Sequence, residues 1–178
     1  MKQLQLRSGD ILIIRKAEKS DAGRIVEYVE TISGESDNLT FGPGEFGISV
    51  EKETEFLVGI SARSNAVYLV AEIDGRIVGS LNFSGGSRPR TAHTGEFGVS
   101  VLKEHWGKGI GTELIRHLLE WSKETGIIRK IDLRVRVDNH TAINVYRKLG
   151  FVQEGVITRD LLINEVFYDA LLMGYHVD

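Results

Sequence analysis

The sequence contains no cysteine among its 178 residues. A chain without cysteine cannot form a disulfide scaffold, a thiolate zinc site or an iron–sulfur centre, and it has no thiol nucleophile. The five histidines show no paired spacing typical of metal ligands, so no bound metal is expected. No apolar run approaches the roughly 18 residues of a membrane helix, and residues 1–10 lack the apolar centre of a signal peptide. We therefore expect a cytoplasmic protein without a membrane partner.

Proline is also scarce, with two residues, and the net charge is only −3. So small a net charge excludes a generally basic nucleic-acid-binding protein. Glycine, in contrast, provides 20 residues, which favours tight turns or a backbone that passes close to a ligand. At about 100–200 residues per domain, residues 1–178 are expected to form a single domain.

Hydrophobic periodicity and turn residues predict an α/β fold. Asp74-Gly75 separates two apolar runs and predicts a β-hairpin, while Ser20 and Asp21 are candidate caps of the first helix. The expected helices are one that carries residues 25–32 and three more over residues 52–63, 109–125 and 142–149. The expected strands cover residues 11–15, 67–73, 77–83, 93–101, 131–137, 151–156 and 166–175, with a loop over 34–47 and a turn near Asn164. This order predicts a mixed sheet that contains hairpins, not a doubly wound parallel sheet.

The most informative segment is the glycine cluster Trp106-Gly107-Lys108-Gly109-Ile110-Gly111-Thr112, between an expected strand and an amphipathic helix. Glycines at such a place let the backbone approach a phosphate, and free N–H groups with the helix dipole attract negative charge. The alternative is a tight strand-to-helix turn without a ligand. A P-loop is excluded, because no Gly-Lys-Ser or Gly-Lys-Thr stands at the required spacing. A dinucleotide-binding turn is disfavoured, because Thr112 replaces the last glycine or alanine and Asp138 follows Gly111 by 27 residues instead of about 20.

A second segment, residues 137–151, combines polar residues with an amphipathic helix. Its apolar positions Ala142, Val145, Tyr146 and Leu149 share one helix face. Taken alone, this pattern favours Tyr146 as a core aromatic residue, because aromatics at helical spacing usually pack in the core.

Together, the two segments resemble the GNAT superfamily of N-acetyltransferases. In that family a Gln/Arg-x-x-Gly-x-Gly/Ala turn binds the pyrophosphate of acetyl-CoA, and a later Asn…Ala…Tyr…Leu-Gly-Phe segment flanks the pantetheine and the thiol. The matching residues are Gly109-Ile110-Gly111 and, later, Asn139, Ala142, Tyr146, Leu149, Gly150 and Phe151. The resemblance spans about residues 68–173 and implies a GNAT-like fold, a central, mostly antiparallel sheet flanked by helices. Trp106 stands where Gln or Arg is usual. A Trp at this position resembles the branch of the family that contains ribosomal-protein N-terminal and spermidine acetyltransferases.

The resemblance implies transfer of an acetyl group from acetyl-CoA, as co-substrate, to a primary amine. Without cysteine no acyl-cysteine intermediate can form, so the amine is expected to attack the thioester directly in a ternary complex. Family members commonly carry a carboxylate on the strand before the glycine turn, where Glu96 stands, which makes it the candidate general base, directly or through water. The alternative role of Glu96 is an exposed carboxylate or a salt-bridge partner. Tyr146 is the candidate general acid for the leaving thiolate.

The resemblance also implies a set of cofactor-binding residues. Backbone amides before the glycine cluster would hold the pantetheine arm and polarise the thioester carbonyl. The full expected set is Val99, Ser100, Val101, Trp106, Gly107, Lys108, Gly109, Ile110, Gly111, Thr112, Asn139, Ala142, Asn144 and Tyr146. Homodimers are common in the family, but no feature of this sequence identifies an interface.

Acidic residues concentrate in residues 21–60, which carry a net charge of −7 against +4 for the rest of the chain. In the family this part of the fold walls the acceptor site, so a cationic acceptor is expected, such as a polyamine, an amino sugar or a basic peptide N-terminus. Glu27, Glu30 and Glu35 are the candidate substrate-binding residues. The alternative is a solvated acidic face, and free amino acids stay open as acceptors.

Two non-enzymatic functions compete with acetyl transfer. A degenerate family member would bind acetyl-CoA as a sensor or interaction module, although the presence of Glu96, Asn139 and Tyr146 argues against it. A nucleotide-binding regulator would rest on the glycine cluster alone.

Overall fold

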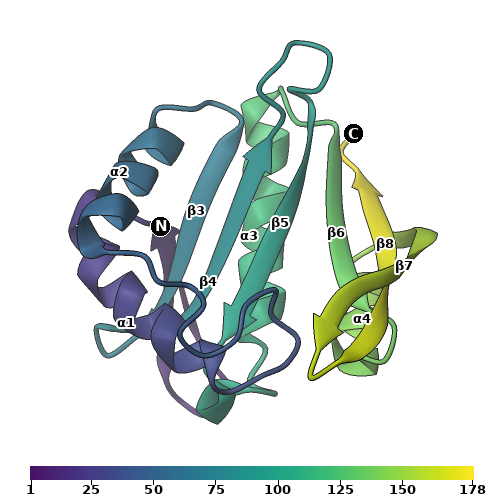
Figure 1. Cartoon of the computed structure of the whole chain (residues 1–178). Helices are drawn as coiled ribbons and strands as arrows, with labels where there is room; N and C mark the ends of the chain where they lie inside the picture. Colours follow the sequence, from purple (N-terminus) through teal and green to yellow (C-terminus); the bar gives the residue numbers. More distant parts are fainter.

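The computed structural model describes residues 1–178 as one eight-stranded sheet with helices on both faces (Figure 1). The strand order is β1-β2-β3-β4-β5-β6-β8-β7, and all neighbours are antiparallel except the parallel pair β5 and β6. The predicted mixed α/β fold with a mostly antiparallel sheet is confirmed.

The strands are β1 (Lys2–Gln5), β2 (Ile11–Lys16), β3 (Ala66–Ile73), β4 (Arg76–Gly85), β5 (Thr94–Val101), β6 (Lys130–Arg136), β7 (Val152–Ile163) and β8 (Val166–His176). The helices are α1 (Ala22–Ser33), α2 (Val50–Ser61), α3 (Ile110–Thr125) and α4 (His140–Lys148), with 3-10 turns η1 (Lys19–Asp21) and η2 (Lys103–His105).

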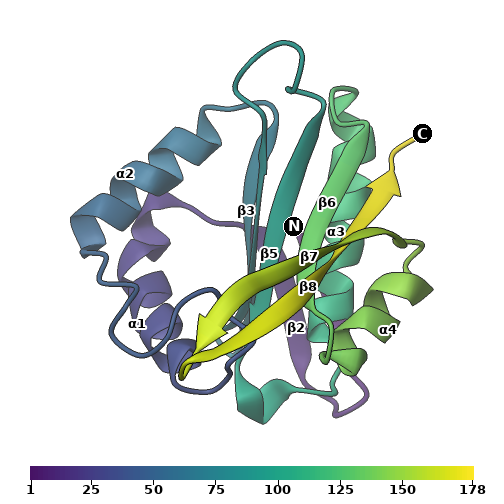
Figure 2. The same ribbon diagram turned by 45° about the vertical axis from the view of Figure 1, so that its right-hand side comes forward.

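Two helical layers lie on opposite faces of the sheet (Figure 2), and the side chains of the central strands alternate between them. On β5, Ser100 points toward α1, where its hydroxyl lies 2.9 Å from that of Tyr28. Phe97 points to the opposite face and packs against Tyr146 of α4, with 6.1 Å between ring centroids. Figure 2 shows α1 and α2 on one face of the sheet and α3 and α4 on the other. Successive residues of β5 therefore face different helical layers.

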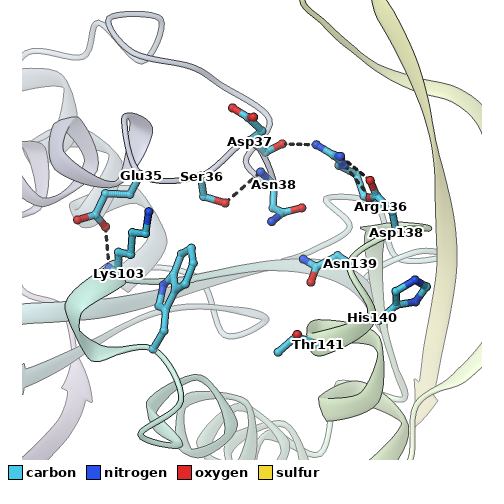
Figure 3. Close-up of a pocket in the computed structure, with 11 residues that line it drawn as sticks. Glu35, Ser36, Asp37, Asn38, Lys103, Arg136, Asp138, Asn139, His140 and Thr141 are labelled. Carbon is cyan, nitrogen blue, oxygen red and sulfur yellow. Dashed lines mark hydrogen bonds and ion pairs between the residues drawn. The ribbon is translucent and has the colours of Figure 1, made fainter.

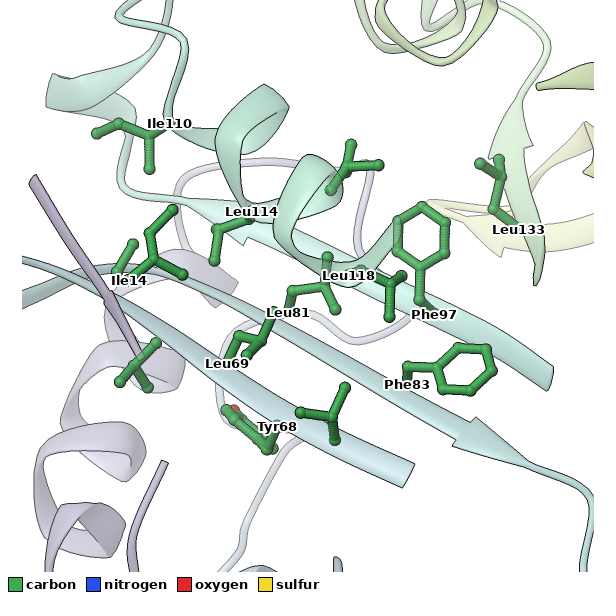
Figure 4. Packing of buried hydrophobic residues seen from close by; sticks show 14 of the residues in the cluster. Ile14, Tyr68, Leu69, Leu81, Phe83, Phe97, Ile110, Leu114, Leu118 and Leu133 are labelled. Carbon is green, nitrogen blue, oxygen red and sulfur yellow. The ribbon is translucent and has the colours of Figure 1, made fainter. Parts of the chain in front are cut away.

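Helix α3 provides the centre of the core, because Ile110, Leu114 and Leu118 recur at helical spacing and are fully buried (Figure 4). The helix packs closely on β4 at Gly79, where an added Cβ would lie 3.3 Å from both Ile110 and Leu114. Full burial of a side chain of this size contributes about 1.5–3 kcal/mol. The apolar stripe therefore fixes the position of the helix whose N-terminus carries the glycine cluster.

Strands β5 and β6 pair over three residues only and then diverge. Residues 94–96 lie opposite residues 130–132, and no pair follows, although β5 continues to Val101 and β6 to Arg136. Figure 1 shows the two ribbons separating toward these ends. Beyond Glu96, the edge of β5 presents backbone N–H and C=O groups that have no strand partner.

Two strands differ from the sequence-based predictions. Strand β1 is not predicted, because its four residues include a single apolar one. The strand expected over residues 151–156 continues to Ile163, since two irregularities in its pairing with β8 break the alternation, and Arg159 adopts a positive φ of 54° within it. The predicted turns at Asp74-Gly75 and Asn164 are confirmed, with positive φ at both positions of each turn.

The predicted cap of α1 is wrong in its chemistry. Asp21 stands at the N-cap position, but its side chain makes no capping hydrogen bond to α1 and accepts the Glu18 N–H of the preceding 3-10 turn at 2.8 Å. Its carboxylate instead accepts hydrogen bonds from the Arg15 guanidinium at 2.7 and 2.8 Å, and this ion pair holds the pKa of Asp21 well below its usual range. None of the helices is long and apolar enough to span a membrane.

Candidate active site

A cavity of about 470 Å³ lies at the diverging ends of β5 and β6 (Figure 3). Three segments line it: residues 35–38 after α1, Lys103 and Trp106 after β5, and Arg136 with residues 138–141 at the start of α4. Ten of its eleven lining residues are polar, and no group of three or more His, Asp or Glu side chains is arranged to hold a metal ion. The cavity therefore suits a polar ligand that enters between the two strands.

The backbone of β5 offers this cavity a partly open edge. Leu102 donates its N–H to Val78 of β4, and in an antiparallel ladder alternate residues share that direction. Val99 and Val101 therefore direct their backbone groups toward the open side, whereas Ser100 directs its own toward β4. The Val101 carbonyl is already occupied, because the Trp106 indole N–H donates to it at 2.7 Å.

Trp106 stands where the turn motif quoted above has Gln or Arg, and its contacts show what it does there. Its side chain folds back onto β5 and is 49% exposed at the cavity, with the Lys103 ammonium 5.9 Å from the ring centroid. An indole N–H that binds Val101 cannot at the same time donate to a phosphate, so any anion at the turn depends on backbone groups and on Lys108.

The glycine cluster is a left-handed turn that leads into α3. Gly107 and Gly109 have φ values of +74° and +86°, which residues with a Cβ adopt only at a cost of about 1–2 kcal/mol. None of the six N–H groups from Gly107 to Thr112 donates to a protein acceptor. The N-terminus of a 16-residue helix adds its dipole to these donors, so the turn can bind an anion such as a pyrophosphate.

The start of α4 forms the opposite wall. Asn139 caps the helix, because its side-chain oxygen accepts the Ala142 N–H at 3.2 Å. Asn139 lines the cavity, and Ala142 is half-buried, whereas Asn144 is exposed on the helix surface. The structure thus brings Asn139 to the candidate cofactor site and leaves Asn144 facing solvent.

Tyr146 lies in an aromatic cluster beneath the divergence of the strands. It is 8% exposed and packs edge-on against Phe97 and Phe151, at 6.1 and 6.0 Å between centroids. Burial raises the pKa of Tyr146 to about 12. Its hydroxyl makes no hydrogen bond to protein and is not among the enclosed polar atoms that lack a partner. The phenol is therefore protonated, and its O–H is free to donate a hydrogen bond to a ligand.

Glu96 stands on the other face of β5, at the last residue that pairs with β6. Its carboxylate is 45% exposed and accepts a hydrogen bond from Arg134 Nε at 3.0 Å, and the same guanidinium reaches Asp160 at 3.3 Å. This ion pair raises the pKa of Arg134. Glu96 thus lies on the strand before the glycine turn with a cation bound to one carboxylate oxygen, and it is not among the residues that line the cavity.

The three acidic candidates of α1 occupy different environments. Glu27 and Glu30 are exposed on the helix face that points away from the core, and they line no part of the cavity. Glu35 does line it, and its carboxylate accepts the Lys103 N–H at 2.7 Å. Of the three, the structure brings only Glu35 to the cavity.

Sequence reasoning misses Arg136, which ties the loop after α1 to the start of α4 (Figure 3). Its guanidinium donates to the Asp37 carbonyl at 3.0 Å and to both carboxylate oxygens of Asp138, at 3.0 and 2.6 Å. It also stacks on Tyr168, 3.8 Å from the ring centroid. The available signal is the alternation along β6, which places Arg134 and Arg136 on one face.

Comparisons with known proteins agree on one family. The model of the acetyltransferase (GNAT) family matches residues 36–151. The L-amino acid N-acetyltransferase AaaT of Escherichia coli (strain K12) is 36% identical over 65% of this chain and 71% of its own length. A GNAT-family acetyltransferase structure from Streptococcus pneumoniae has a TM-score of 0.91 at 32% identity, covering 94% of this chain and 99% of the other. The structure of yncA from Salmonella typhimurium, which includes its cofactor acetyl-CoA, shares the fold with a TM-score of 0.82 at 20% identity over 94% of each chain.

Proposed function

Because this chain belongs to the acetyltransferase (GNAT) family and is an acetyl-CoA-dependent N-acetyltransferase, we propose that it transfers the acetyl group where β5 leaves β6. Acetyl-CoA is the co-substrate, and a primary amine is the acceptor. The observation that carries the proposed location is the opening between β5 and β6 beside six unbonded N–H groups of the glycine cluster. The comparisons confirm the family, the fold and the cofactor that the sequence led us to expect.

The proposed position of acetyl-CoA follows from these donors. The pyrophosphate would lie on the N–H groups from Gly107 to Thr112, at the positive end of the α3 dipole. The pantetheine arm would run along the open edge of β5, where the Val99 backbone has no strand partner. Asn139 and Ala142 would form the opposite side of the channel.

In the proposed reaction, the neutral amine attacks the thioester carbonyl from the α1–α2 face of the sheet. A C–N bond forms, the C–S bond breaks, and the ammonium proton passes to Glu96, directly or through water. Arg134 Nε donates a hydrogen bond to Oε1 of Glu96. The proton is therefore accepted by the second oxygen, Oε2, or by Oε1 after Arg134 has been displaced. The acetylated amine and CoA are then released, after Glu96 has returned its proton to water and the thiolate has taken one from water.

Tyr146 would stabilise the leaving thiolate from the opposite face. With a pKa of about 12 the phenol stays protonated at neutral pH, so it is available as a donor throughout the working range. Full proton transfer to a thiolate, whose acid has a pKa of about 8.5, runs uphill. The main contribution of Tyr146 is therefore a hydrogen bond to the sulfur as negative charge develops on it.

The cofactor site is tested first by thermal unfolding with acetyl-CoA. At a ligand concentration one hundredfold above Kd, binding stabilises the folded state by about 2.7 kcal/mol. For a chain of this size we expect a rise in Tm of roughly 5–10 °C.

NADH and ATP serve as controls in the same experiment, because both carry a pyrophosphate but lack the pantetheine arm. A shift with acetyl-CoA that neither control reproduces supports the proposed site. Equal shifts with all three ligands would mean that the turn binds phosphates without selecting the cofactor.

For the acceptor we propose a small cationic amine or a basic peptide amine, guided by the acidic segment 21–60. Neutralising Glu27, Glu30 and Glu35 together is expected to raise KM for a cationic amine while KM for acetyl-CoA changes little. The variant Glu27→Gln/Glu30→Gln isolates long-range attraction, because these side chains are exposed and line no part of the cavity.

Steady-state kinetics at low and high salt separate the two contributions. Attraction by exposed charges is screened, so the effect of Glu27→Gln/Glu30→Gln should vanish at high ionic strength. Glu35→Gln also weakens the bond to the Lys103 N–H, so its effect should persist in salt. An amine KM that is unchanged in the triple variant at low salt refutes the attraction.

A further inference from the structure

The loop between α1 and α2, residues 34–49, borders the cavity and has few bonds to the rest of the protein. Only two hydrogen bonds join it to any element other than the two helices at its ends. The Glu35 carboxylate accepts the Lys103 N–H at 2.7 Å, and the Asp37 carbonyl accepts a hydrogen bond from Arg136 at 3.0 Å. The later part of the loop is held by apolar side chains that pack against the core: Leu39, Phe41 and Phe46. The part that lines the cavity therefore depends on the two hydrogen bonds.

These two bonds end on the two strands that diverge at the cavity. Lys103 comes two residues after the end of β5, and Arg136 is the last residue of β6. Residues 35–38, which we call the strap, therefore cross from one strand end to the other (Figure 3). Asn139 and Thr141 line the cavity on the side opposite the strap. The strap and the start of α4 thus enclose the space between the diverging strands.

Arg136 is a rigid anchor for the strap. Its side chain is 11% exposed, and its guanidinium stacks on Tyr168 at 3.8 Å from the ring centroid. Nε and Nη2 donate to the two carboxylate oxygens of Asp138 at 3.0 and 2.6 Å, which leaves Nη1 to donate to the Asp37 carbonyl. The planar guanidinium fixes the directions of all these donors at once, which a lysine ammonium cannot do.

We propose that Arg136 is a positioning residue for acetyl-CoA and keeps the strap closed beside the pantetheine arm. The inference rests on the proposed function and adds to it a residue that touches no reacting atom. Without Arg136 the strap keeps only its bond to Lys103 and is detached from β6 for part of the time. The apparent affinity for a ligand falls in proportion to the fraction of molecules in the binding conformation. A strap that is closed for about one-tenth of the time raises Kd for acetyl-CoA about tenfold.

The effect on turnover should be small by comparison. Acetyl-CoA that has bound holds the strap closed, because it occupies the closed conformation only. At saturating acetyl-CoA the loss of Arg136 therefore changes kcat by less than about twofold, while KM for acetyl-CoA rises with Kd. A residue that supports only the fold would not produce this division between KM and kcat.

The test compares Arg136→Gln with Arg129→Gln as the matched control. Arg129 directly precedes β6 at its other end, and its exposed side chain makes no hydrogen bond or ion pair. Both variants lose one positive charge. Calorimetric titration with acetyl-CoA should give a Kd about tenfold higher for Arg136→Gln and an unchanged Kd for Arg129→Gln. Steady-state kinetics with propylamine as the amine measure KM and kcat for the same proteins.

Arg136→Lys separates the position of the side chain from its charge. Lysine keeps the positive charge but cannot donate to both oxygens of Asp138 and to the Asp37 carbonyl together. We expect Kd for acetyl-CoA to stay close to that of Arg136→Gln. A wild-type Kd in Arg136→Lys would show that the charge attracts the cofactor, and it would overturn the inference.

Hydrogen exchange gives a readout that depends on neither ligand nor turnover. The Asn38 N–H, bonded to Ser36 Oγ at 3.1 Å, should exchange faster in Arg136→Gln and Arg136→Lys than in the wild type and in Arg129→Gln. Saturating acetyl-CoA should slow this exchange in Arg136→Gln, since the bound cofactor holds the strap closed. Amides of β3 and β4 should keep their wild-type rates, which shows that the fold is intact.

An unchanged Kd for acetyl-CoA in Arg136→Gln, whatever its Tm, would overturn the inference and give Arg136 a structural role only. An equal rise in Arg129→Gln would also overturn it, because the loss of charge would then explain the rise. If Arg136→Gln does not fold, Asp138→Asn weakens the same anchor and keeps the guanidinium, and its Kd should rise by a smaller factor. An unchanged Kd in that variant would overturn the inference in the same way.

Each of these negative results leaves the proposed function intact, because the wild type still binds acetyl-CoA and acetylates an amine. A wild-type protein that binds no acetyl-CoA would instead refute the proposed function.

Discussion

Replacing Tyr146 with phenylalanine is expected to lower kcat about 100-fold while leaving acetyl-CoA binding unchanged. A positioned hydrogen-bond donor at an atom that gains negative charge in the transition state contributes about 10²–10³-fold to kcat. The phenol has no hydrogen bond to protein, so its removal breaks no native contact, and the ring keeps its packing against Phe97 and Phe151. The measurement is steady-state kinetics combined with the acetyl-CoA-dependent shift in Tm.

Tyr175 supplies the matched control, because its ring belongs to the same aromatic cluster, 5.3 Å from the Phe151 centroid. Tyr175→Phe should leave kcat at the wild-type value. Since the pKa of Tyr146 is about 12, the wild type should also show no loss of kcat from deprotonation of this donor up to about pH 10. A wild-type kcat in Tyr146→Phe would show that another group or water stabilises the leaving thiolate.

The same pair of variants separates an enzyme from a protein that only senses acetyl-CoA. A sensor binds the cofactor equally with or without the Tyr146 hydroxyl and shows no amine-dependent release of CoA in either form. The enzyme shows that release in the wild type and in Tyr175→Phe, and loses most of it in Tyr146→Phe.

The parts of the site that could be predicted from the sequence depend on local geometry. The apolar stripe of α3 and the glycines before it lie within one short segment, so periodicity and the need for positive φ at Gly107 and Gly109 reveal both. Tyr146 is a similar case, because its helical spacing correctly places it in an aromatic core. Its second role depends on the missing partner of the hydroxyl, which spacing does not show.

The parts that could not be predicted depend on pairs that are distant in the sequence. The divergence of β5 from β6 follows from pairing between residues 94–96 and 130–132, and neither strand alone indicates where it stops. The same holds for the ion pair of Glu96 with Arg134, which lie 38 residues apart. In the acidic segment, net charge alone cannot tell exposed Glu27 from buried Glu53. A signal for Glu53 is nevertheless present, because it shares the spacing of Leu57 and Ile60 on an apolar helix face.

Replacing Glu96 with glutamine is expected to lower kcat about 100-fold with both KM values nearly unchanged, if the carboxylate accepts the amine proton. Stability should hardly change, because the ion pair with Arg134 is about half exposed and such pairs contribute about 0–1 kcal/mol. The loss therefore has to appear in the rate, and it is measured by steady-state kinetics with saturating acetyl-CoA.

Arg134→Gln decides whether the carboxylate itself or the ion pair matters. If Glu96 is the base, Arg134→Gln leaves the carboxylate in place and changes kcat only slightly, and the double variant repeats the loss of Glu96→Gln. If the pair only holds β5 beside β6, each single variant breaks the same contact, and both lower kcat equally. Equal losses would remove Glu96 from the reaction and leave water as the proton acceptor. A loss confined to Glu96→Gln would identify the carboxylate as the proton acceptor and show that its ion pair with Arg134 is not needed for the reaction.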